Sequence, residues 1–196
     1  MSGLVGLDPA ERHRVVCARF AGLVEGVADW SAPTPVPEWC ARDVVGHLVG
    51  WLPGFVAGFT SARLPDAAVD VAVDPVGAWR AHAAAVQALL DDPAVAASPA
   101  QVPGGEEQPL ADVLDRFWTT DVLMHAWDLA RASGQDDRLD EDWVAATLPG
   151  MEAMEPVLRS SGQFGSRVPV PDDAPAQDRL LGLIGRDPAW RPPARG

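Results

Sequence analysis

The chain has 196 residues and a formal net charge of −13 at pH 7. This length corresponds to one domain, or to one domain with an appendage, and is sufficient for a hydrophobic core. The negative charge argues against nucleic acid and against an anionic membrane surface, because both are bound by clustered Lys and Arg. All 15 basic residues are arginine, which excludes a Schiff-base lysine and a P-loop lysine.

The two cysteines, Cys17 and Cys40, form neither a CxxC motif nor a disulfide framework, and the chain does not open with a secretory leader pattern. We therefore expect a cytoplasmic protein with reduced thiols. The stretch from Val44 to Ala62 carries no formal charge and is long enough to suggest a membrane span. Its histidine and proline, and the acidic composition of the chain, favour a buried helix instead.

Helix signals recur along the chain. Asp8, followed by Pro9 and Glu11, is typical of a capped helix start, and apolar residues at helical spacing follow it. A second helix is predicted from about Cys40 to Ala62. A third opens at Asp74, which again precedes a proline.

Residues 93–108 are rich in Pro, Gly and Ala and predict a long loop. Pro109 begins a fourth helix, which ends at Gly134. Asp140 opens a fifth helix, in which Pro149 is a candidate break.

A short last helix is predicted from Asp178 to Ile184. The chain shows neither strand-like alternation of useful length nor an internal repeat. This pattern predicts an all-α protein in which residues 1–160 form a four-helix bundle. Residues 161–196 would be a C-terminal extension that packs on the bundle, with the end of the tail disordered.

Asp121 and His125 lie four residues apart on the fourth predicted helix. Such residues share a helix face with Cβ atoms about 5–6 Å apart, so they can close on one divalent cation. His47, on the second predicted helix, supplies another imidazole. Two imidazoles and one carboxylate form a ligand set that leaves a coordination position open. The alternative is that Asp121 only fixes the tautomer of His125 through a hydrogen bond.

Other acidic and histidine side chains receive structural interpretations. Asp128, three residues beyond His125, is interpreted as an acceptor that orients a ligand imidazole, with a fourth ligand or a helix–helix anchor as alternatives. Asp43 lies in the first turn of its helix and is interpreted as a cap. His13 and His82 lie at the edges of apolar faces and are interpreted as structural residues.

The helix face of His47 also carries Gly50, Trp51, Gly54 and Gly58. Each glycine lowers the stability of a helix by about 1 kcal/mol relative to alanine. The presence of several glycines on one face therefore needs an explanation. Close contact with another helix is one interpretation, and an open space for a ligand above His47 is the other. In the second case, Gly50, Trp51 and Gly54 would bind a cofactor.

Three stretches of the sequence resemble a known family. Residues 30–35, followed by Trp39, residues 42–43 and His47, resemble the opening signature of the mycothiol-dependent maleylpyruvate isomerase metal-binding family. That family belongs to the DinB-like four-helix-bundle superfamily. Residues 125–134 resemble its second signature. Residues 178–190 resemble the ending of an uncharacterised subgroup of metal-binding proteins.

The resemblance implies a three-ligand site in which His47, Asp121 and His125 hold a metal, which is zinc in the isomerases, with mycothiol as the thiol cofactor. Asp121 stands where the isomerase often has glutamate. Val36 stands in place of a cysteine, and Cys40 in place of Thr or Ser. The isomerase also has a larger C-terminal domain, which we expect 196 residues to be too few to contain, so the resemblance implies the metal site rather than maleylpyruvate isomerisation itself.

These observations favour a divalent-metal-binding protein, holding zinc, nickel or a similar ion, that acts as a mycothiol-dependent transferase or isomerase. A bound metal lowers the pKa of a thiol, which is about 8.5 when free, and so provides a nucleophile at neutral pH. The expected partners are a small-molecule thiol and an electrophilic substrate, and the chain would be a monomer or a homodimer. A metal-binding bundle without turnover and a purely structural bundle are the alternatives.

Overall fold

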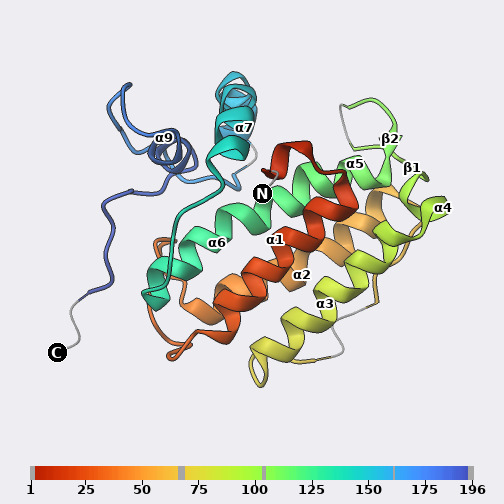
Figure 1. Cartoon of the computed structure of the whole chain (residues 1–196), viewed down its shortest axis with the longest axis horizontal. Coiled ribbons are helices and arrows are strands. Elements are labelled where there is room, and N and C mark those ends of the chain that lie inside the picture. The colour runs from red at the N-terminus through yellow and green to blue at the C-terminus, as the bar shows by residue number, and fades with distance from the viewer. Residues whose placement is uncertain (1–2, 66–68, 103–104, 161, 194–196) are drawn as a thin grey trace.

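The computed structural model describes residues 3–65, 69–102, 105–160 and 162–193. Four long helical segments form the core of the molecule (Figure 1): α1 (Pro9–Glu25), α2 (Ala41–Phe59), α3 (Pro75–Asp91), and a continuous fourth segment of α5 (Leu110–Leu114), the π-helical η2 (Asp115–Thr119) and α6 (Thr120–Ser133). Helices α1 and α2 each pack against both α3 and α6. This arrangement confirms the predicted all-α, DinB-like bundle.

The predicted helix boundaries rest on side-chain caps that the structure contains. The Asp8 carboxylate accepts a hydrogen bond from the backbone N–H of Glu11 at 2.8 Å, and so caps α1. Asp43 accepts one from the backbone N–H of Cys40 at 2.8 Å, which confirms the capping interpretation. Hydrogen bonds from Cys40 hold the pKa of Asp43 below its ordinary value. Gly134 ends α6 in the left-handed conformation, with φ of 70°.

Two helices differ from their predicted extents. Helix α2 ends at Phe59, short of the expected Ala62. Helix α7 (Glu141–Ala153) continues through Pro149, so the candidate break is absent. Pro149 is exposed, and water can therefore bond the carbonyl that proline leaves without an N–H partner. A short helix, α8 (Glu155–Ser160), follows α7.

The segment predicted as a long loop contains short elements. It holds α4 (Pro93–Ala96) and an antiparallel pair of two-residue strands, β1 (Pro99–Ala100) and β2 (Gln108–Pro109). Asp92 caps α4 by accepting hydrogen bonds from the backbone N–H groups of Ala94 and Val95. These elements are too short to produce a hydrophobic period, which is why the sequence did not reveal them.

The C-terminal helices lie together beside the bundle (Figure 1). Helix α9 (Ala176–Leu183) packs against α7, and α7 packs against the 3-10 helix η1 (Leu4–Gly6). The extent of α9 agrees with the predicted last helix to within two residues at each end. The domain boundary at residue 160 stays a prediction. The predicted disorder at the tail end falls on residues 194–196, which lie outside the described residues.

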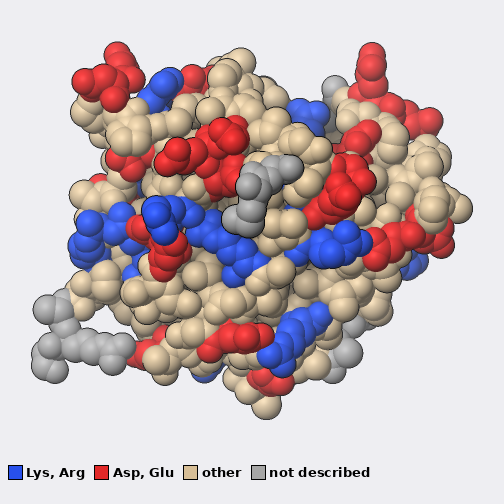
Figure 2. Space-filling view, in the orientation of Figure 1, with Lys and Arg blue, Asp and Glu red and all other residues tan. Residues whose placement is uncertain are grey.

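Acidic side chains are spread over the face shown in Figure 2, with arginines gathered in a band across its middle. Arginines of α1 pair with carboxylates of neighbouring segments. Arg12 forms an ion pair with Asp115 of η2, and the Nη2 atom of Arg14 lies 2.8 Å from Asp91 at the end of α3. The pairs join α1 to the helices on both of its sides.

The uncharged stretch of α2 lies in the bundle, where the buried residues are Val44, Val45, Leu48, Val49, Leu52 and Val56. No described helix combines the length and the apolar composition that crossing a membrane requires.

Two of the four histidines belong to the bundle core. His13 is fully buried, and its Nδ1 atom lies 2.7 Å from the side-chain oxygen of Gln87. His82 is 5% exposed, its ring centroid lies 5.0 Å from that of Trp118, and its Nε2 atom has no hydrogen-bond partner among the described residues. Burial, with a smaller contribution from the nearby His13, lowers the pKa of His82 to about 4.

This burial predicts a loss of stability in mild acid. Below pH 6.5 the unfolded chain protonates His82, whereas the folded protein does so only near pH 4. The free energy of unfolding therefore falls by about 2 kcal/mol between pH 7 and pH 5 through this group. Urea unfolding followed by tryptophan fluorescence should show a smaller fall for His82→Leu than for the wild type. An equal fall in both proteins would contradict the assignment.

Candidate metal centre

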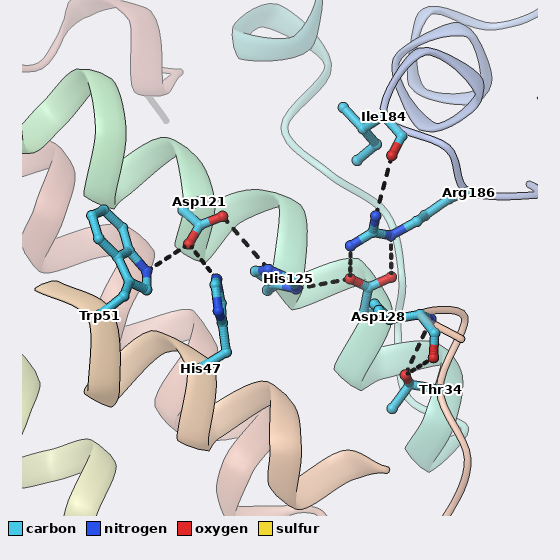
Figure 3. A network of polar contacts seen from close by, with 9 residues as sticks. Thr34, His47, Trp51, Asp121, His125, Asp128, Ile184 and Arg186 are labelled. Atoms are coloured by element: carbon cyan, nitrogen blue, oxygen red, sulfur yellow. Dashed lines mark hydrogen bonds and ion pairs between the residues drawn. The ribbon is translucent and has the colours of Figure 1, made fainter. Parts of the chain in front are cut away.

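The structure brings together the three residues predicted to hold a metal (Figure 3). His47 comes from α2, and Asp121 and His125 come from α6, which packs against α2. The Nε2 atom of His47 lies 3.1 Å from Oδ2 of Asp121, and the Nε2 atom of His125 lies 3.5 Å from Oδ1. One ligand atom from each residue lies within 4.8 Å of the others. Ligand atoms around tetrahedral zinc, at bond lengths of about 2.0–2.2 Å, are roughly 3.3–3.6 Å apart, and the two imidazole–carboxylate distances are close to these values.

The site is deep on the α6 side and open on the α2 side. The side chain of His125 is 6% exposed, that of Asp121 is 18% exposed, and that of His47 is 33% exposed. Asp121 lies in the first turn of α6, directly after the π-helical segment η2. π-helical turns alter the register of the residues that follow, and they occur frequently at functional sites. The exposed third of the His47 side chain leaves the cluster in contact with solvent on the α2 side.

The Asp121 carboxylate remains ionised in this environment. Burial acts to raise the pKa of Asp121, but the neighbouring His125 and the hydrogen bonds from His47 and Trp51 outweigh it. The pKa of Asp121 is therefore held below its ordinary value. An ionised carboxylate is the form that binds a cation.

Two tryptophans complete the walls of the site. The indole N–H of Trp51 donates a hydrogen bond to Oδ2 of Asp121 at 3.0 Å. The ring of Trp39 is stacked on His125, with a centroid distance of 5.7 Å and an interplanar angle of 18°, and its centroid lies 5.1 Å from that of His47. The predicted cofactor-binding role of Trp51 stays a prediction, and its observed contact is with the carboxylate.

Asp128 lies behind His125, away from His47. It is fully buried, and its Oδ2 atom lies 2.9 Å from Nδ1 of His125. This is the contact expected of an acceptor that orients an imidazole, and it leaves Nε2 of His125 directed toward Asp121. Burial acts to raise the pKa of Asp128, but contacts with His125 and Arg186 outweigh it and lower the pKa. Sequence reasoning did not single out Arg186 as a site residue.

The glycines on the His47 face border open space. Apart from its chain neighbours and the adjoining backbone of α2, a Cβ atom built at Gly50, Gly54 or Gly58 would meet no described atom within 4 Å, and all three positions are exposed. Contact with a second described helix therefore does not account for these glycines. The interpretation that they leave space for a ligand beside His47 stays a prediction.

Comparisons with known proteins identify the family. The model of the mycothiol maleylpyruvate isomerase N-terminal domain matches residues 13–130, which include the three candidate ligands and Asp128 but not Arg186. Two Mycobacterium tuberculosis proteins, each named only as uncharacterised, are 31% identical to this chain over 188 residues, or 92% of this chain and 98% of each relative. No solved structure gives a significant match. The chain therefore belongs to the mycothiol maleylpyruvate isomerase N-terminal domain family.

Proposed function

We propose that this protein binds a divalent metal through His47, Asp121 and His125, and that it uses the site in chemistry of a small thiol. The observation that carries the proposal is the convergence of two imidazoles from different helices on one ionised carboxylate. A carboxylate that only fixed the tautomer of His125 would need no second imidazole. Nitrogen and oxygen ligands of this kind favour zinc, nickel or a similar ion over calcium or magnesium.

The neighbouring residues have distinct roles in this proposal. Asp128 holds the imidazole of His125, and Trp51 holds the carboxylate of Asp121. Trp39 covers the imidazoles and limits access of water from its side. A divalent ion at this site would lower the pKa of a bound thiol and so provide a nucleophile at neutral pH.

Mycothiol is the proposed thiol, with an electrophilic small molecule as the second substrate. The family description names this thiol, and the exposed Gly50 and Gly54 leave space for a bulky cofactor next to Trp51. The proposed reaction class is therefore a thiol-dependent transfer or isomerisation. A metal-binding protein without turnover would use the same three ligands, and thiol binding distinguishes the two functions.

The metal site predicts the composition of the purified protein. Protein prepared without added metal should contain close to one zinc, nickel or similar ion per chain, measured by elemental mass spectrometry. His125→Ala and Asp121→Asn should lose this ion and remain folded by circular dichroism, since most of the buried side chains are apolar. His82→Leu, which removes a buried histidine outside the cluster, should retain it. Wild-type protein that holds no metal and takes up none on titration would refute the proposal.

The glycine face predicts a separate effect on thiol binding. Cobalt-substituted protein should develop a sulfur-to-metal charge-transfer band when mycothiol is added. Gly54→Leu should abolish the band and keep the metal, because the new side chain enters the open space and leaves the ligands untouched. Gly22→Leu is the matched control, since Gly22 is an exposed glycine of α1 with no described atom near its Cβ position.

The outcomes separate the two functions. If the wild type binds cobalt and shows no band with mycothiol, the protein binds metal without using this thiol. If the band survives in Gly54→Leu, the thiol lies elsewhere than on the glycine face.

A further inference from the structure

Arg186 connects the C-terminal segment, which we define as residues 162–193, to the buried carboxylate of Asp128 behind the candidate metal centre (Figure 3). Its Nε atom donates to Oδ1 of Asp128 at 3.1 Å, and its Nη2 atom donates to Oδ2 at 2.9 Å. The same Oδ2 atom lies 2.9 Å from Nδ1 of His125. A two-point contact between guanidinium and carboxylate fixes the plane of the carboxylate as well as its charge.

The backbone after α9 is shaped to place this guanidinium. Gly185 adopts φ of 84°, and the following N–H, that of Arg186, bonds the carbonyl of Leu181 at 2.8 Å. A Cβ atom at Gly185 would lie 2.8 Å from the backbone of Gly165, so this turn accepts only glycine without rearrangement. The Nη1 atom of Arg186 donates to the carbonyl of Ile184 at 3.2 Å. Three donors of the guanidinium are therefore held by fixed acceptors.

Because Asp128 is fully buried, its carboxylate depends on Arg186 for charge compensation. With the carboxylate plane fixed, Oδ2 remains opposite Nδ1 of His125. Because a carboxylate can only accept a hydrogen bond, this contact places the hydrogen of the His125 ring on Nδ1. It also keeps Nε2 directed toward Asp121.

We propose that Arg186 is a positioning residue of the metal centre, through which the C-terminal segment sets the orientation and tautomer of His125. This inference rests on the proposed metal-binding function. It adds a residue outside the stretch that the family model matches, residues 13–130. The segment thus takes part in the site without contacting the metal.

If Arg186 only docked the C-terminal segment, its loss would leave the orientation and tautomer of His125 unchanged. Arg131 has such a docking contact and serves as the comparison. Arg131 lies on α6 and donates through Nη2 to the carbonyl of Pro188 at 2.9 Å. It joins α6 to the same segment, and its other contacts are with the Asp137 carboxylate and the ring of Trp127. Loss of Arg131 should weaken docking and leave the imidazole in place.

The test compares Arg186→Lys, Arg186→Met and Arg131→Met with the wild type. Zinc affinity is measured by competition with a chelator, and the hydrogen on Nδ1 of His125 is followed in the metal-free protein by nitrogen-15 NMR. Both Arg186 variants should bind zinc about 10–100-fold more weakly and lose the single Nδ1–H tautomer. Arg131→Met should bind zinc within about twofold of the wild type and keep this tautomer.

Two results would overturn the assignment: wild-type zinc affinity in the Arg186 variants, or an unchanged His125 tautomer in them. If Arg186→Met does not fold, Arg186→Lys carries the test, because it retains a positive charge beside Asp128 and lacks the two-point geometry. If the wild type binds no zinc, the proposed function fails, while the tautomer measurement still decides whether Arg186 positions His125.

Discussion

The ionised carboxylate of Asp121, enclosed between α2 and α6, is the constraint on which the organisation of the site depends. A buried charge is costly unless other groups compensate it. Here His47 and Trp51 approach the carboxylate from α2, while His125 approaches it from one turn further along α6. The helix pair cannot separate or rotate without leaving this charge uncompensated. The same arrangement brings one ligand atom each from His47, Asp121 and His125 within 4.8 Å of one another, close enough for one divalent ion to contact all three.

The carboxylate of Asp128, which is fully buried, extends this organisation to the C-terminal segment. His125 lies between Asp121 and Asp128, with one ring nitrogen facing each. Arg186 compensates the charge of Asp128, just as His47 and Trp51 of α2 compensate the charge of Asp121. The order of contacts therefore runs from α2 through α6 to the turn after α9. Docking of the C-terminal segment and the position of a candidate ligand are parts of one network.

The sequence predicted the features that depend on local spacing. The cap at Asp8 and the i,i+4 pair of Asp121 and His125 follow from helix geometry, which a short stretch of chain determines. The contacts of Trp39 and Arg186 could not be predicted in this way. Both residues lie outside the long helices. The directions in which their side chains point depend on turns that include positive φ angles at Glu38 and Gly185. Such turns and the partners they reach are set by tertiary packing.

X-ray absorption spectroscopy of zinc-loaded protein tests the central claim most directly, because it reports the atoms bonded to the ion. The account predicts nitrogen and oxygen neighbours at about 2.0–2.2 Å, with the multiple-scattering pattern of two imidazoles. In His47→Ala, one imidazole contribution should disappear. In protein free of added thiol, a sulfur neighbour at about 2.3 Å, which Cys17 or Cys40 would have to supply, or a spectrum without imidazole would contradict the account.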